Sequence, residues 1–177
     1  ERAARVPTYQ RNLATLERVD RELALELKRA HRSSVALRPV GTGLAEYAGP
    51  GQPWVQLWAV TASAAQFEAD RLVRQCCTFE DSFIAGVGDC SLPEAAVRLV
   101  RPGQRIHLVE LQLSRVRALL EVVDLRSAIA DGRLHLHIGT RALSTLAPYA
   151  QAAADFEASV VGGDPVSMQL LRAAAGQ

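Results

Sequence analysis

The fold is decided by two stretches of sequence, SFIAGVGDC at residues 82–90 and IHLVE at residues 106–110. Each begins with a short apolar run, which is typical of a buried strand. The first run breaks at a glycine turn, Gly86-Val87-Gly88, and residues 92–100 then have the composition of a helix. The second run closes at Glu110. A strand, a glycine turn, a helix and another strand in this order predict parallel strands joined by a crossover helix.

The alternation continues toward the C-terminus. Apolar residues spaced three and four apart predict a helix from Leu113 to Val123, and residues 134–138 predict a third strand. Residues 82–138 are therefore expected to form a βαβαβ unit. Beyond it we expect a helix over residues 141–158 that breaks at Pro148. A short strand at residues 159–161 and a helix over residues 165–175 are expected to follow.

Upstream of this unit the pattern is different. Residues 8–30 carry leucines three and four apart, which predicts one amphipathic helix, capped at Thr8, that packs as an arm against a larger body. Residues 33–40 and 54–60 resemble strands around a Gly- and Pro-rich connection, and residues 62–77 resemble a helix. The expected fold class is α/β, a Rossmann-like three-layer sandwich with a mostly parallel sheet. The expected division is a helical arm with a β-hairpin at residues 1–61 and a Rossmann-like domain at residues 62–177.

The bulk composition excludes several classes of protein. A net charge of +1 over 177 residues provides no strong field for nucleic acid or an acidic membrane. No apolar run is long enough to span a membrane, and no signal peptide is visible. The three cysteines have no zinc-site or disulfide spacing, so we expect a reducing, cytoplasmic compartment. The sequence does not begin with Met, which suggests a piece of a longer protein.

The candidate site is the glycine turn together with the tip of the next strand. A turn that opens a helix points unpaired backbone N–H groups outward, where they suit a polar or anionic ligand group. Glu110 lies 22 residues beyond Gly88, a position where nucleotide folds place the carboxylate that accepts the ribose hydroxyls. The expected binding residues are Gly86, Val87, Gly88, Asp89, Cys90, Glu110 and Leu111.

Alternatives remain at this site. The two glycines suit any tight turn, bound or empty, and Glu110 could cap its own helix instead of holding a ribose. Asp89 places a negative charge where a phosphate would lie, which disfavours a pyrophosphate cofactor. Cys90 stands where methyltransferase-like turns usually have glycine. The cofactor thus stays unknown: S-adenosylmethionine, another nucleotide, or none.

The other candidate residues favour structure over chemistry. His107, His135 and His137 lie on predicted strands, where packing or surface exposure explains them better than a metal site. Trp54 and Trp58 could stack on a base, but filling a core is their commoner role. The sequence contains no Ser-His-Asp set, no phosphate loop and no acidic-Pro-Pro-aromatic signature. No catalytic residue is therefore assigned.

The order of these motifs resembles a known family. The segment Tyr9-Gln10-Arg11-Asn12-Leu13-Ala14-Thr15-Leu16 is similar to the N-L-x-x-L helix of the motility-associated factor (Maf) proteins. Residues 83–88 are similar to their glycine turn, and Val109-Glu110, residues 120–125 and residues 132–136 follow in the same order. The most specific part is the segment from Val123 to Leu136.

This resemblance implies a function. Maf proteins are cytoplasmic glycosyltransferases thought to attach nonulosonic acids to flagellin Ser or Thr, and their relatives include an archaeal pterin pyrophosphokinase. The chain would be a Rossmann-like domain of such a transferase that binds a ligand or a partner without being catalytic by itself. Its partners would be a protein acceptor such as flagellin and the remainder of a longer chain. The alternative is an S-adenosylmethionine-dependent methyltransferase.

Overall fold

The computed structural model describes residues 7–30, 36–40, 44–48, 55–56, 62–88, 90–162 and 164–176. For residues 36–40, 44–48, 55–56 and 62 it describes the backbone alone.

A four-stranded parallel sheet forms the centre of the molecule, in the order β6-β5-β4-β7. The strands are β4 (Asp81–Ala85), β5 (Arg105–Glu110), β6 (Leu134–Ile138) and β7 (Val160–Gly162). The predicted strands are confirmed as parallel neighbours, with Ala85 beside Val109 in β5 and beside Gly162 in β7. The carboxyl ends of β4, β5 and β7 therefore meet at one edge of the sheet.

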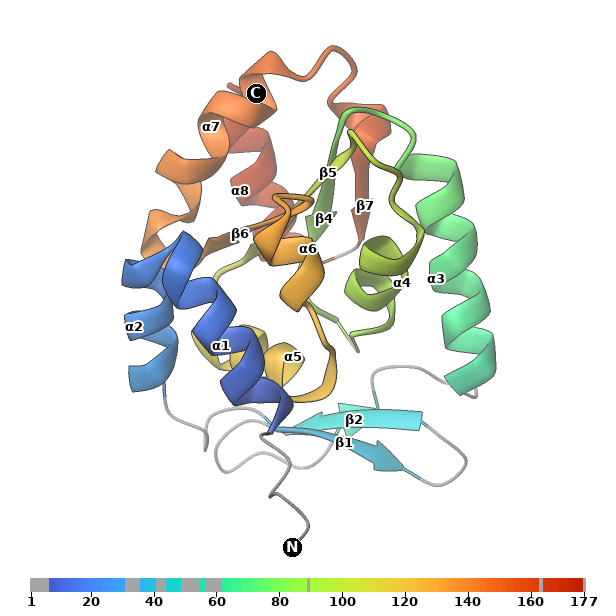
Figure 1. Ribbon diagram of the computed structural model, residues 1–177. Helices are drawn as coiled ribbons and strands as arrows, with labels where there is room; N and C mark the ends of the chain where they lie inside the picture. The colour runs from blue at the N-terminus through green and yellow to red at the C-terminus, as the bar shows by residue number, and fades with distance from the viewer. Residues whose placement is uncertain are drawn as a thin grey trace, which may run out of the picture.

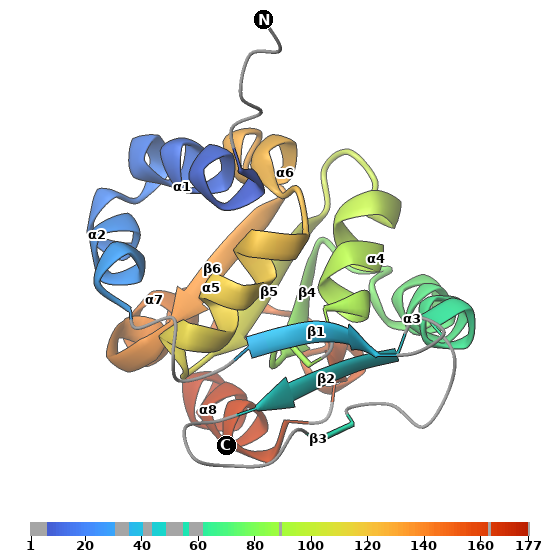
Figure 2. The same cartoon turned by 90° about the horizontal axis from the view of Figure 1, so that it is seen from below.

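Helices cover both faces of this sheet and make three layers (Figure 1). One face carries α4 (Ser91–Leu99), α5 (Leu113–Val122) and α6 (Arg126–Ala130), with α3 (Ala62–Cys76) beside α4. The other face carries α7 (Ala142–Ala152) and α8 (Pro165–Ala175), which pack against each other. Figure 2, the view from below, shows α3 and α4 side by side and well apart from α7 and α8. The Rossmann-like sandwich predicted from the sequence is confirmed.

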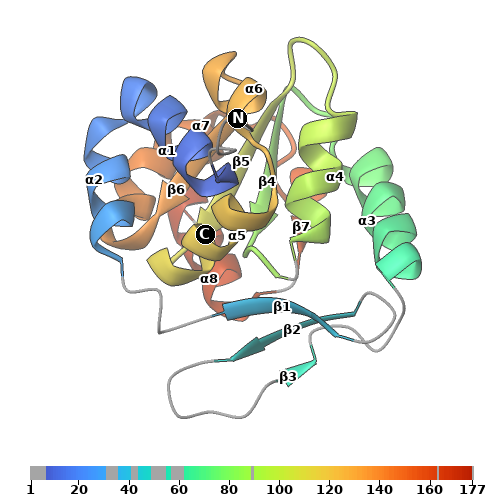
Figure 3. The same ribbon diagram turned by 60° about the horizontal axis from the view of Figure 1, so that its bottom comes forward.

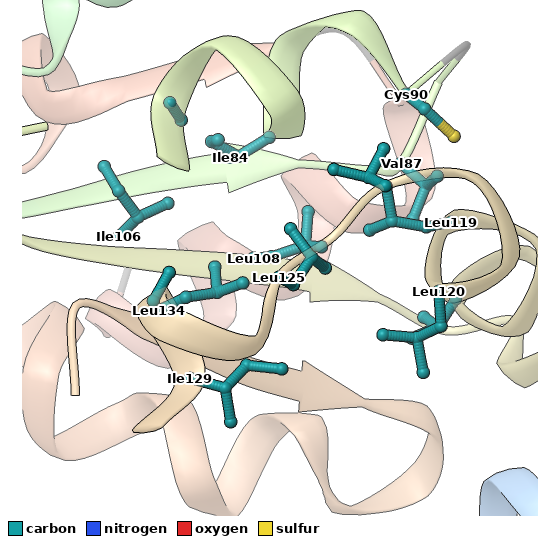
Figure 4. Close-up of a cluster of buried hydrophobic side chains, with 14 of the residues drawn as sticks. Ile84, Val87, Cys90, Ile106, Leu108, Leu119, Leu120, Leu125, Ile129 and Leu134 are labelled. Carbon is teal, nitrogen blue, oxygen red and sulfur yellow. The ribbon is translucent and has the colours of Figure 1, made fainter. Parts of the chain in front are cut away.

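Two apolar cores lie on opposite sides of the sheet because successive strand residues point to opposite faces. Ile84 and Leu108 belong to the larger core under α4, α5 and α6, where Figure 4 shows them with Leu119, Leu125 and Ile129. Phe83 and Val109 belong to the smaller core under α7 and α8. The near-continuous apolar runs of β4 and β5 are thus explained by burial on both faces.

The N-terminal segment forms two helices where the sequence predicted one, α1 (Thr8–Val19) and α2 (Arg21–Arg29). Asp20 leaves the helical conformation and its side chain caps α2, accepting a hydrogen bond of 3.0 Å from the backbone N–H of Leu23. The predicted cap is also displaced, since Pro7 occupies the N-cap position of α1 and Thr8 is the first helical residue. The apolar stripe continues across the break, because Leu16 and Leu27 are both buried in the larger core.

Asn12 anchors α1 to the segment between α5 and α6. Its side chain is fully buried. The amide nitrogen donates to the carbonyl oxygens of Leu120 at 2.9 Å and Val123 at 2.6 Å. The amide oxygen accepts from the backbone N–H of Leu125 at 2.9 Å. One side chain thus satisfies three buried backbone groups of a distant segment.

A small antiparallel sheet lies beyond α5, in the order β1-β2-β3 (Figure 3). Its strands are β1 (Ala36–Val40), β2 (Leu44–Ala48) and β3 (Val55–Gln56). The expected hairpin is present, but its second strand is β2, within the segment predicted as a connection. Trp54 and Trp58 lie outside the described residues. The division between residues 61 and 62 stays a prediction, although α1 and α2 belong to the same core as Ile84.

The helix expected over residues 141–158 is shorter, and Pro148 does not break it. α7 contains Pro148 and ends at Ala152. The proline ring is exposed to solvent, and proline removes a single N–H from the helical hydrogen-bond ladder. Packing of Leu146 and Ala150 against the sheet holds the helix together across that position.

Candidate functional site

The glycine turn closes the carboxyl end of β4 against β5. Gly86 has a φ of +87°, and its N–H donates to the carbonyl oxygen of Val109 at 2.8 Å. Val87 is buried in the larger core, and Cys90, with a φ of 74°, is buried beside the start of α4. Gly88, with a φ of +57°, is exposed, and a Cβ built on it would meet no atom within 4 Å. Among the described residues of the turn, the open position is therefore Gly88.

Glu110 lies next to this turn, as expected from the sequence, but its side chain is only 2% exposed. One oxygen accepts from the N–H of Val87 at 3.2 Å. The other accepts from the N–H of Gln112, the residue that precedes α5, at 2.9 Å. The same carboxylate thus closes the glycine turn and caps the entrance of α5. Both oxygens that a ribose diol would use already have protein partners.

Asp164 and Arg115 cover the rest of the niche. A Cβ added to Gly86 would come within 2.6 Å of the Cβ of Asp164, so that side chain lies directly over the glycine. Asp164 also caps α8 by accepting from the N–H of Ser167 at 2.8 Å. Arg115 bridges the two acids, with its guanidinium 3.5 Å from Asp164 and 3.7 Å from Glu110.

The charge of this group is negative, with two carboxylates and one guanidinium. Partial burial opposes ionisation of Asp164, but hydrogen bonds from Ser167 and the nearby Arg115 outweigh it and lower the pKa of that carboxyl. An added phosphate would meet this negative charge, which disfavours a phosphate-bearing ligand at the turn.

The structure brings Gly86, Val87 and Glu110 together, and it places Gly88 at the rim. Cys90 points into the core, Leu111 is half-buried, and Asp89 lies outside the described residues. Whether these residues bind a ligand stays a prediction. Sequence reasoning missed Arg115 and Asp164. The cap signature Asp164-Pro165 is visible in the sequence, but its position over Gly86 depends on β7 lying beside β4.

A second group of polar side chains lies on the face of the sheet that α7 covers. The sequence did not predict that these residues would contact one another. Arg105 donates two hydrogen bonds, of 2.6 Å and 2.7 Å, to Asp81. Asp81 lies 2.8 Å from Nε2 of His107, and Nδ1 of His107 lies 2.9 Å from Nε2 of His137. Nδ1 of His137 lies 2.9 Å from the hydroxyl of Thr145. Register places His135 and Phe83 on either side of His107, and the rings stack with centroids 5.0 Å apart.

The ionised state of Asp81 determines which nitrogen of each histidine carries the hydrogen. The Arg105 guanidinium and His107 hold the pKa of Asp81 down at about 2, so Asp81 is ionised and only accepts. Nε2 of a neutral His107 must then donate, and its Nδ1 accepts from Nε2–H of His137. Nδ1 of His137 then offers a lone pair to Thr145, whose single hydroxyl hydrogen also lies within reach of the carbonyl oxygens of Arg141 at 3.1 Å and Ala142 at 3.2 Å. Within the described residues, no group of three or more His, Cys, Asp or Glu side chains is arranged to hold a metal ion.

We expect this histidine pair to make the protein sensitive to acid. Burial lowers the pKa of His107 to about 4, and burial together with His107 lowers that of His137 to about 3. Both rings are neutral when folded, so below an ordinary histidine pKa of about 6.5 the unfolded chain binds protons that the folded chain rejects. This contribution to the free energy of unfolding is fully present above a pH of about 6.5. It falls by about 3 kcal/mol per ring as the pH approaches 4.

Urea unfolding at pH 7.0, 5.5 and 4.5 measures this loss. The variant His137→Gln retains a donor and an acceptor without titrating, so its stability should fall less across this range. His135→Gln removes a neighbouring ring that helps to lower the pKa of both histidines, so its stability should also fall less with acid, but by a smaller margin than in His137→Gln. Equal slopes in all three proteins would contradict the assignment.

The fold and the turn define a Rossmann-like α/β domain. Its structure is similar to that of MAf glycosyltransferase from Magnetospirillum magneticum AMB-1, with a TM-score of 0.65 and 14% sequence identity. The match covers 95% of this chain and 35% of that chain, so the protein spans about a third of the length of the structure it resembles. This confirms the predicted resemblance at the level of the fold.

The sequence comparisons add no family. No protein-family model matches the sequence, and no curated protein matches it. In the described part of the chain, no helix is long and apolar enough to cross a membrane.

Proposed function

We propose that this chain is the Rossmann-like module of a Maf-type protein glycosyltransferase and acts as a non-catalytic, partner-binding unit in a longer cytoplasmic protein. The partners in this proposal are the remainder of that protein and an acceptor such as flagellin. The structural similarity over 95% of the chain supports the family, and the 35% coverage of the other protein supports the longer context.

One observation carries the non-catalytic part of the proposal, the internal commitment of Glu110. A buried carboxylate that accepts from two backbone N–H groups of its own chain is not available to a ribose diol. Each oxygen keeps a second lone pair, but the side chain is 2% exposed, so a nucleoside ligand would first have to displace the groups that cover it. One of these is Asp164, which lies over Gly86 and would lose its contacts there.

The alternative is an S-adenosylmethionine-dependent methyltransferase. The positive φ of Gly86 and Gly88 and the open space at Gly88 favour it, because they resemble a turn that a ligand approaches closely. The two readings differ in what Glu110 does. In the first it supports the fold, and in the second it binds ligand.

Thermal unfolding with and without ligand separates them. A ligand at a hundredfold excess over its Kd stabilises by about 2.7 kcal/mol, which for a chain of this size raises Tm by roughly 5–10 °C. We expect no such shift with S-adenosylmethionine or with a nucleotide-activated nonulosonic acid. A saturable shift with S-adenosylmethionine would replace the proposal with the methyltransferase.

The variant Glu110→Gln tests the structural role directly. In either orientation the amide places an NH₂ group against the N–H of Val87 or of Gln112, so we expect a loss of about 1–3 kcal/mol of stability. The variant Glu94→Gln removes the same charge from an exposed position on α4 and should cost less than about 1 kcal/mol. Equal stabilities for the two variants would show that the hydrogen bonds of Glu110 contribute little.

A further inference from the structure

A hollow opens at the end of the molecule opposite the glycine turn. Its volume is about 260 Å³, and it is lined by Val73, Arg74, Cys77, Thr78, Leu99, Arg101 and Gln104. These residues come from the carboxyl ends of α3 and α4 and from the segments that lead into β4 and β5. The hollow therefore belongs to the amino ends of the strands.

The arginines of this region outnumber the carboxylates available to them. Arg71 pairs with Glu68, Arg98 pairs with Asp70, and Arg105 pairs with both Asp81 and Glu80. Each of these acids is thus engaged by an arginine.

Two guanidinium groups remain, those of Arg74 and Arg101. Neither has an ion pair or a side-chain hydrogen bond with the described residues, and both line the hollow. Arg74 experiences the charge of Asp70, but that carboxylate is already bonded to Arg98 and Gln66. Among the described residues, the hollow therefore has an excess of positive charge.

Two backbone carbonyls near the hollow are engaged within the protein. Gln104 donates to the carbonyl oxygen of Cys77, just after α3, at 3.2 Å and to that of Phe79 at 3.3 Å. Burial raises the pKa of Cys77 to about 12, so its thiol stays uncharged. The lining thus combines two arginines, the hydroxyl-bearing Thr78 and the apolar residues Val73 and Leu99 with the uncharged Cys77 and Gln104.

We propose that this hollow binds a small phosphate-bearing molecule, with Arg74 and Arg101 holding the phosphate. Guanidinium groups match the geometry of phosphate oxygens, and Thr78 can add a hydroxyl donor. The hollow is larger than a phosphate ion and slightly below the range of about 300–1,000 Å³ that is usual for drug-sized ligands. Its apolar wall favours a phosphomonoester with a short carbon chain over inorganic phosphate.

NMR titration of the whole chain tests this site, using inorganic phosphate and glycerol 3-phosphate against sodium chloride at matched ionic strength. We expect saturable amide shifts confined to residues 73–78 and 99–104, with tighter binding of the ester. The double variant Arg74→Gln/Arg101→Gln should weaken binding at least about tenfold, the factor expected from the loss of one charge-assisted hydrogen bond.

The matched control is Arg172→Gln. Arg172 is exposed in the last turn of α8, as Arg74 is in the last turn of α3, but it does not line the hollow. This variant should bind as the wild type does. Shifts that do not saturate, or binding that survives the double variant or weakens equally in the control, would overturn the proposal. These outcomes are independent of the glycine turn, which lies at the other end of the strands.

Discussion

Replacing Asn12 with leucine lowers the free energy of unfolding by at least about 3 kcal/mol. Leucine is an apolar helix former of similar size, so the substitution preserves the volume but leaves the carbonyls of Leu120 and Val123 and the N–H of Leu125 without their partner. All three groups face a fully buried side chain, and each unsatisfied group costs about 1–3 kcal/mol. In thermal unfolding, a chain of this length should lose roughly 6–12 °C of Tm.

Two further variants show whether this loss comes from the hydrogen bonds. Asn12→Asp preserves the acceptor for Leu125 but turns a carboxylate toward two carbonyl oxygens, so it should be at least as destabilising near neutral pH. Gln10→Ala, on the exposed side of the same helix, should change the stability by less than about 0.5 kcal/mol. If Asn12→Leu were as stable as Gln10→Ala, the anchor would have no energetic role.

Replacing Gly162 with alanine is the second large effect. Gly162 ends β7 beside Ala85 of β4, and its φ is +108°. An added Cβ would come within 2.7 Å of the carbonyl oxygen of Ala85 and 3.1 Å of its nitrogen. These are backbone atoms of the central strand and cannot move aside, so the short strand β7 must separate from β4. We expect a loss of about 3 kcal/mol or more, from backbone strain and overpacking together.

The control for Gly162 is Gly103→Ala. Gly103 has a φ of +87°, but an added Cβ would meet no atom within 4 Å. This variant therefore measures the conformational strain without the contact and should cost about 1–2 kcal/mol. Chemical denaturation of both variants gives the difference, and equal losses would show that the contact with Ala85 is relieved at little cost. Hydrogen exchange of residues 83–85 should accelerate in Gly162→Ala alone, since β7 protects that edge of β4.

The Asn12 anchor gives a physical reason for the sequence resemblance. Two of the segments that carry it, the motif beginning at Tyr9 in α1 and the segment from Val123 onward, are joined in the structure by this one side chain. The sequence showed Asn12 as part of the motif but did not predict its role, because an asparagine within a helix gives no indication of a distant partner.

The sheet could be predicted in detail because its strands are apolar on both faces and separated by glycine turns. The bounds of the third strand were predicted without error, and those of β4 and β5 to within one residue at either end. The predictions of secondary structure that were wrong concern positions where local signals compete with tertiary contacts. At Asp20 a continuous apolar stripe concealed a helix break, and at Pro148 packing preserved a helix that a local rule would end.

The sequence by itself determined that the central strands are parallel, that a turn follows at Gly86 and that Glu110 lies beside it. Periodicity and glycine placement are local properties of the chain, and parallel strands joined by helices leave few other arrangements. Only the tertiary structure decided what Glu110 contacts, that Asp164 covers Gly86, and that Asp81, His107, His137 and Thr145 form one hydrogen-bonded chain. Those contacts join residues far apart in sequence, and their geometry depends on how β7, α7 and α8 pack on the sheet, which no local pattern encodes.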